Sequence, residues 1–157
     1  MTVRVERTFE VHALPEDVWA FISDHEKRAG AISVVEDFDA DDEYHATWHV
    51  SLPIPIIDRT VPVETEDTDR EEPRYARFVG RSRAMRVIGE HELEGIDADG
   101  NDIDDLAAAV HTRLVNRFVV DGRLPGVERF FKRNLDDELE NLQHAIGRDL
   151  GVETVSR

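Results

Sequence analysis

The chain has 157 residues, which suits one domain, so residues 1–157 are expected to form a single unit. Its 35 Asp and Glu residues exceed its 19 Lys and Arg residues, and the net charge of −16 repels the phosphates of nucleic acids and anionic lipids. The absence of cysteine excludes disulfides, thiolate catalysis and cysteine-bound zinc.

No run of about 18 apolar residues is present, and the N-terminal segment lacks the apolar core of a signal peptide. We therefore expect a cytoplasmic protein with no stable membrane insertion and no nucleic-acid partner. Lysine occurs only as Lys27 and Lys132, while aspartates are scattered along the chain, a pattern typical of proteins from salt-accumulating archaea. An ordinary acidic protein is the alternative to this halophilic interpretation.

Residues 3–11 alternate apolar and polar side chains, which predicts a half-buried strand with Arg7 on the same face as Phe9. A helix is predicted to begin at Pro15, because proline suits the first helical turn, and to fade before Gly30. Its apolar stripe is formed by Val18, Trp19 and Ile22.

Between residues 33 and 119, strand-like runs alternate with turn signals and show no helical period. They predict strands at 33–38, 44–52, 58–67, 74–81, 84–95 and 104–119. The last of these is ambiguous, because its alanines and a four-residue apolar spacing also suit a helix. The alternation of apolar and polar residues around Leu114 favours a strand.

After Gly122 the apolar period becomes helical, and Pro125 and Gly151 suit the start and the end of a long helix. The stripe consists of Val127, Phe131, Leu135, Leu139, Leu142, Ile146 and Leu150. Its spacing predicts an inner face without any acid–base group, so any catalytic residue is expected to lie on the sheet.

This order of elements predicts an α+β fold in which a curved antiparallel sheet of about seven strands wraps around the long C-terminal helix. A helix that crosses a curved sheet touches it along a line, and the space beside that line suits an apolar ligand.

Three segments carry a family resemblance over about residues 3–150. The opening, FEVHALPEDVWAFISDHEKRAGAI, resembles the start of the START/Bet v1-like (SRPBCC) superfamily, which has the helix-grip fold. The remainder is similar to the carbon monoxide dehydrogenase-related and polyketide cyclase/dehydrase branch, on SLPIPIIDRTVPVETED, RYARFVGRSRAMRVIGEHEL and VDGRLPGVERFFKRNLDDELENL. The resemblance implies a pocket for lipids, sterols, quinones or polyketides, in proteins that range from carriers to aromatase/cyclases.

Nine residues are predicted to line this pocket from the sheet and the helices: Ile22, Trp48, Phe78, His91, Thr112, Asn116, Phe131, Leu135 and Leu139. The strand pattern puts Arg7, His91, Thr112 and Asn116 on inner faces, where they would form a polar end. Arg7 and His91 are the only candidate catalytic residues. Alternatively, both lie near strand ends and reach solvent or carboxylates, and Trp48 is simply part of the core.

Three functions remain open at this point. The first is the binding or carriage of a small apolar ligand, such as a lipid, quinone or polyketide-like molecule, without catalysis. The second is a polyketide cyclase/dehydrase-like enzyme that uses His91 or Arg7. The third is an accessory subunit of a molybdenum hydroxylase with no ligand of its own, and a partner enzyme or a homodimer is compatible with each.

No cofactor and no metal are expected. His45 and His49 are four residues apart on a predicted strand, which separates them by about 13 Å, too far to share one ion.

Overall fold

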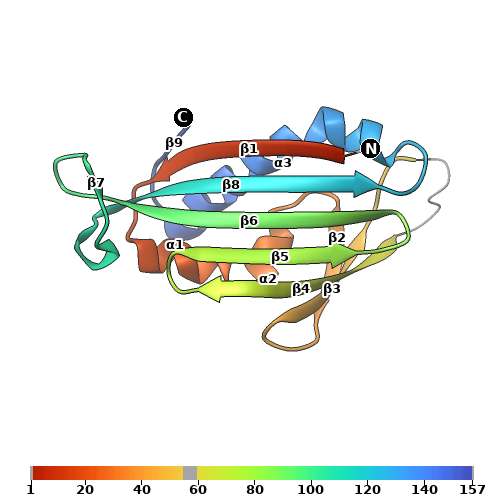
Figure 1. Cartoon of the computed structure of the whole chain (residues 1–157), viewed down its shortest axis with the longest axis horizontal. Coiled ribbons are helices and arrows are strands. Elements are labelled where there is room, and N and C mark those ends of the chain that lie inside the picture. The colour runs from red at the N-terminus through yellow and green to blue at the C-terminus, as the bar shows by residue number, and fades with distance from the viewer. Residues whose placement is uncertain (1, 55–59, 157) are drawn as a thin grey trace.

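The structure is a computed structural model that describes residues 2–54 and 60–156. Long strands, three α-helices and two very short strands follow one another along the chain (Figure 1). The elements are β1 (Thr2–Val11), α1 (Pro15–Ile22), α2 (His25–Gly30), β2 (Val35–Ala40), β3 (His45–Val50), β4 (Val61–Glu71), β5 (Tyr75–Arg81), β6 (Met85–Ile96), β7 (Asp102–Ile103), the 3-10 turn η1 (Leu106–Ala108), β8 (His111–Gly122), α3 (Val127–Leu150) and β9 (Thr154–Ser156).

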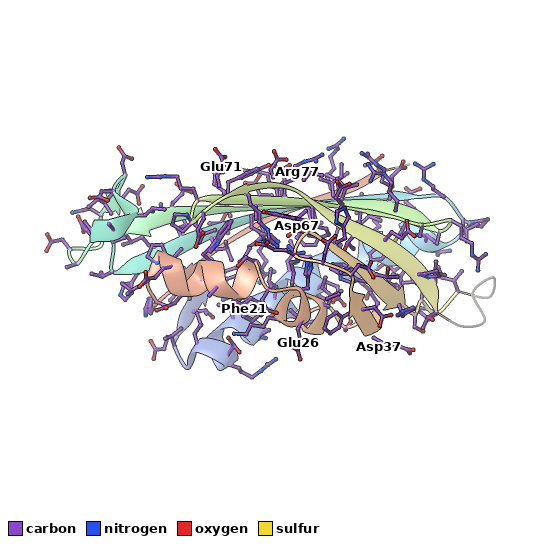
Figure 2. All side chains as sticks on the ribbon, turned by 90° about the horizontal axis from the view of Figure 1, so that it is seen from below. Phe21, Glu26, Asp37, Asp67, Glu71 and Arg77 are labelled. Atoms are coloured by element: carbon purple, nitrogen blue, oxygen red, sulfur yellow. The ribbon has the colours of Figure 1, made fainter. Side chains whose placement is uncertain are left out.

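The strands form one antiparallel sheet in the order β2-β3-β4-β5-β6-β8-β1-β9, with β7 paired to β6 beside this path. All three helices lie on one face of the sheet (Figure 2), where Glu71 and Arg77 point away from the helices and Asp67 lies on the helical side. The predicted α+β helix-grip fold is therefore confirmed. Of the described helices, none is long and apolar enough to cross a membrane.

The main seven strands correspond to those predicted, whereas β7 and β9 were not foreseen. With two and three residues, they are too short to show an alternating pattern. The start of the predicted 58–67 strand, residues 58 and 59, lies outside the described residues, as do residues 55 and 56 of the predicted break.

The predicted strand at 104–119 is wrong at its beginning, because residues 106–108 form a 3-10 turn and β8 starts at His111. The Asp105 side chain accepts a hydrogen bond from the Ala107 backbone N–H at 3.1 Å and so caps this turn. Val110, expected on the inner face, is exposed as a result.

The helix α3 ends where the sequence predicts, with Gly126 and Gly151 in the left-handed conformation at its two caps (φ 91° and 65°). Its stripe packs on the sheet and joins two groups of buried side chains. The first surrounds Trp48, Phe78 and Phe131, and the second surrounds α1 and the last turns of α3. The candidate site lies in the first group.

Candidate functional site

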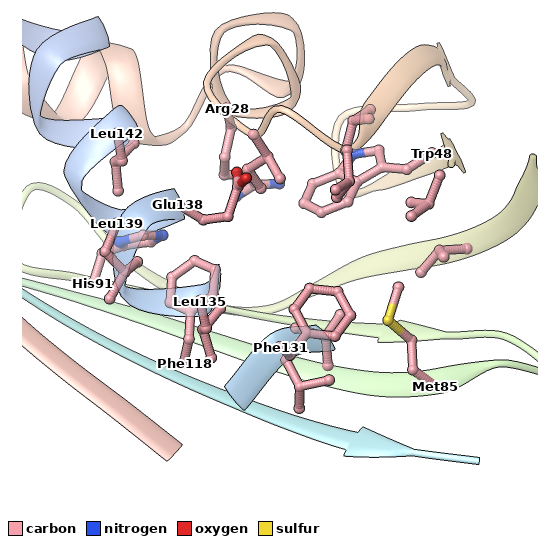
Figure 3. Close-up of a pocket in the computed structure, with 17 residues that line it drawn as sticks. Arg28, Trp48, Met85, His91, Phe118, Phe131, Leu135, Glu138, Leu139 and Leu142 are labelled. Atoms are coloured by element: carbon pink, nitrogen blue, oxygen red, sulfur yellow. The ribbon is translucent and has the colours of Figure 1, made fainter. Parts of the chain in front are cut away.

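A cavity of about 50 Å³ lies between the first half of α3 and the inner face of the sheet (Figure 3). Phe131, Leu135 and Leu139 of α3 form one wall. Aromatic and aliphatic side chains of the sheet form the opposite wall, with Trp48 and Phe118 the largest of them. The segment between α2 and β2 closes the cavity through Ile32, Val34 and the first residue of β2, Val35.

This volume is far larger than the roughly 10–15 Å³ that one water molecule needs. It is also well below the roughly 300–1,000 Å³ of pockets that hold drug-sized ligands. The interior therefore has an unfilled centre, and a larger ligand requires its walls to move.

Five of the nine predicted residues line the cavity, and they are Trp48, His91, Phe131, Leu135 and Leu139. The other four are buried but lie behind the lining. Ile22 belongs to the second group of core side chains, around α1. Thr112 donates a hydrogen bond to the Ala13 carbonyl at 3.0 Å.

Phe78 lies flat against Gly89 of the neighbouring strand, because a Cβ atom at Gly89 would come within 2.2 Å of the Phe78 ring. The space that the sequence predicts beside His91 is therefore occupied by this ring. Its centroid is 6.4 Å from that of His91, and the two rings are nearly parallel.

Arg7 does not reach the cavity. It faces the helical side, but its Nη1 donates to both carboxylate oxygens of Asp136 on α3, each at 3.2 Å. The alternative in which Arg7 reaches a carboxylate describes this contact, because α3 runs directly beside β1. Arg7 is therefore badly placed to act on a ligand.

His91 is fully buried and has one hydrogen-bond partner, Asn116. The Asn116 amide nitrogen donates to the Arg7 carbonyl at 3.2 Å, which turns its oxygen towards His91. His91 Nδ1 therefore carries a proton and donates it to Asn116 Oδ1 at 2.7 Å. Burial lowers the pKa of His91 to about 4, so that the ring is neutral at pH 7.

The sequence did not reveal the pair formed by Arg28 of α2 and Asp67 of β4, whose side chains are both 2% exposed. Arg28 Nη2 donates to Asp67 Oδ1 at 2.7 Å, and its guanidinium lies 4.9 Å above the centroid of Phe78. Arg70 donates to the other Asp67 oxygen at 2.7 Å. The alternation that buries Val63 and Thr65 of β4 continues to Asp67, which was the available signal.

The prediction that the inner face of α3 has no acid–base group is wrong. Glu138 is 7% exposed and lines the cavity, because it follows Leu135 by three residues and precedes Leu142 by four. Its carboxylate accepts hydrogen bonds from the Ser33 backbone N–H at 2.8 Å and from the Ser33 hydroxyl. Glu138 thereby ties the segment that closes the cavity to α3.

The described residues contain no group of three or more His, Asp or Glu side chains that could hold a metal ion. The two histidines considered above have separate acidic neighbours. His45 Nδ1 lies 2.9 Å from Asp42, and His49 Nε2 lies 3.0 Å from Asp39.

Together, the curved sheet, the long covering helix and the apolar cavity beneath it define a START-like helix-grip protein. More narrowly, the chain belongs to the family described as polyketide cyclase / dehydrase and lipid transport, which it matches over residues 2–147. A search of curated proteins gives no match. The resemblance to the carbon monoxide dehydrogenase-related branch stays a prediction.

Solved structures share the fold along almost the whole chain. A conserved protein from Geobacillus kaustophilus is 14% identical with a TM-score of 0.71, covering 98% of this chain and 99% of its own. A START superfamily protein from Mycobacterium smegmatis is 16% identical with a TM-score of 0.66, covering 92% and 95%. The Zhui aromatase/cyclase from a Streptomyces species is 17% identical with a TM-score of 0.62, covering 94% and 96%. At these identities the likeness shows the fold alone.

Proposed function

We propose that the protein binds a small apolar ligand in the cavity between α3 and the sheet. The observation that carries this proposal is an unfilled centre walled by apolar side chains from both layers. Protein interiors are normally close-packed, so an unfilled apolar space is unusual unless it is used. A ligand there would be stabilised by roughly 25 cal/mol for each Å² of apolar surface removed from water.

A ligand larger than the cavity needs a way in, and the segment from Ala31 to Val34 is the candidate. Its side chains Ile32 and Val34 are only half-buried, and it has no regular secondary structure. Glu138 of α3 holds this segment through its two hydrogen bonds from Ser33. Outward movement of this segment would open the cavity while leaving the sheet and α3 intact.

Native mass spectrometry of the protein purified in high salt tests the proposal. We expect a co-purifying apolar molecule, such as a lipid or a quinone, that dissociates at higher collision energy. A clean mass of the chain alone, together with no uptake from a panel of lipids and quinones, would contradict it. That result would favour an accessory subunit without a ligand.

A second candidate function is proton transfer of the polyketide cyclase/dehydrase kind, and it is supported by His91. A neutral imidazole beside an apolar cavity suits a general base. This function predicts that His91→Ala abolishes cyclisation of a poly-β-keto substrate while folding and ligand affinity change little. Retained turnover in that variant would contradict a catalytic His91.

A further inference from the structure

The buried hydrogen bonds behind His91 have a fixed direction. The Arg7 carbonyl can only accept, so the amide nitrogen of Asn116 faces it and the amide oxygen faces His91. That oxygen can only accept, so Nδ1 of His91 is the protonated ring nitrogen. The other nitrogen, Nε2, is then an acceptor with a free lone pair.

Nε2 has no hydrogen-bond partner among the described residues, although His91 is 0% exposed. It is the ring nitrogen farther from the backbone, on a side chain that lines the cavity (Figure 3). A buried acceptor without a partner is destabilising, so a donor supplied from the cavity would be favoured.

The other polar groups around the cavity differ from His91. Trp48 Nε1 and Arg28 Nε are buried without partners among the described residues, and both can only donate. The carboxylate of Glu138 already accepts two hydrogen bonds from Ser33. Among the residues described above, His91 therefore provides the unpaired acceptor.

We infer that the ligand of this cavity carries a hydroxyl group, which donates a hydrogen bond to Nε2 of His91. This inference rests on the proposed function and specifies the chemistry of its ligand. A neutral donor is required, because an ammonium group would lose its hydration and lie near the Arg28 guanidinium.

The rings around His91 favour an aromatic hydroxyl over an aliphatic one. Phe118 presents its edge to His91 with centroids 5.7 Å apart, and Phe78 and Trp48 continue the same aromatic surface. A flat ligand ring packs well against such a surface. A hydroxyl also reproduces the hydrogen bond of any water molecule that it displaces from Nε2.

Phenol and toluene test the inference, because they have nearly the same shape and differ in the hydroxyl. Dissociation constants of both are measured by NMR titration for the wild type, for His91→Phe, and for His144→Phe as a matched control. His144 is an exposed histidine of α3. In His91→Phe the ratio of the phenol constant to the toluene constant should rise about tenfold, which corresponds to one net hydrogen bond.

The control variant should keep the wild-type ratio. The ¹⁵N spectrum of the wild-type imidazoles provides a measurement that needs no variant. It should show an unprotonated Nε2 in His91 whose resonance shifts on addition of phenol and not of toluene.

Each outcome decides something. Binding of both compounds with an unchanged ratio in His91→Phe, or a protonated Nε2 in the free protein, would overturn the hydroxyl inference and leave the ligand-binding function standing. Failure of the wild type to bind either compound would contradict both.

Discussion

His91 combines complete burial with a neutral ring, and this makes its contribution to stability depend on pH. Its pKa is about 4 in the folded protein and about 6.5 in the unfolded chain, so the unfolded chain binds more protons between these values. The stability that this group contributes is present above pH 6.5 and is lost as the pH falls towards 4.

Comparison with His91→Gln isolates this contribution. The wild type should lose about 3 kcal/mol more unfolding free energy than the variant between pH 6.5 and 4, measured by urea denaturation at each pH. The carboxylates of Asp67 and Glu138 and the charge of Arg28 are present in both proteins, so their effects largely cancel. Parallel pH profiles would show that His91 titrates normally.

The ion pair of Arg28 and Asp67 is also buried, and removal of one charge leaves the other without compensation. We expect Asp67→Asn to lower the unfolding free energy by about 3 kcal/mol, because Arg28 and Arg70 then face each other without a carboxylate. Asp149→Asn is the matched control. It breaks the solvent-accessible pair with Lys27 and should cost less than about 1 kcal/mol. Equal losses in urea denaturation would contradict this account.

At the scale of elements, the contact between β5 and β6 depends on Gly89. An alanine there would place its Cβ 2.2 Å from the Phe78 ring, and this ring is held between Arg28 and the sheet. Gly89→Ala should therefore lower the unfolding free energy by about 1–3 kcal/mol. At Gly30, nothing lies within 4 Å of an added Cβ, and Gly30→Ala should be neutral or stabilising by up to about 1 kcal/mol. A stable Gly89→Ala protein would show that Phe78 can move aside.

Elements with a long period were predictable from the sequence, and contacts between distant segments were not. The helix α3 follows from its apolar spacing and its two glycines, and the inner faces of β6 and β8 follow from strict alternation. The pairing of Arg28 with Asp67 joins residues 39 apart, and that of Ser33 with Glu138 joins residues 105 apart. No local pattern encodes such pairs, because they depend on how the helices lie across the sheet.

The same limit explains the candidate site. Trp48, His91 and the α3 residues were predicted to line the cavity from their faces alone, and they do. Asn116 and Phe78 share the inner side of the sheet but lie behind the lining, since a face does not specify depth. Glu138 was missed because its charge set it apart from an otherwise apolar stripe.

At the scale of the whole molecule, the net charge of −16 opposes compaction. Five aspartates gather in the segment 97–105 at one end of the long axis (Figure 1). The halophilic interpretation stays a prediction. It implies that the melting temperature falls as NaCl is lowered from molar to ~0.1 M, where charges interact over ~10 Å.

The double variant Asp99→Asn and Asp104→Asn removes two exposed charges from this end and should depend less on salt. Calorimetry of both proteins across the salt range makes the comparison. A wild-type melting temperature that is independent of NaCl would mean that the acidic surface is not an adaptation to salt.

The central claim is that apolar ligands occupy the space beneath α3, and a fluorescence titration with N-phenyl-1-naphthylamine tests it most directly. The wild type should bind one probe molecule saturably, and Leu135→Trp, which fills the cavity, should lose this binding while it remains folded by circular dichroism. Val155→Trp, at an exposed position of β9, should bind like the wild type. Equal binding by all three proteins, or binding by none, would contradict the claim.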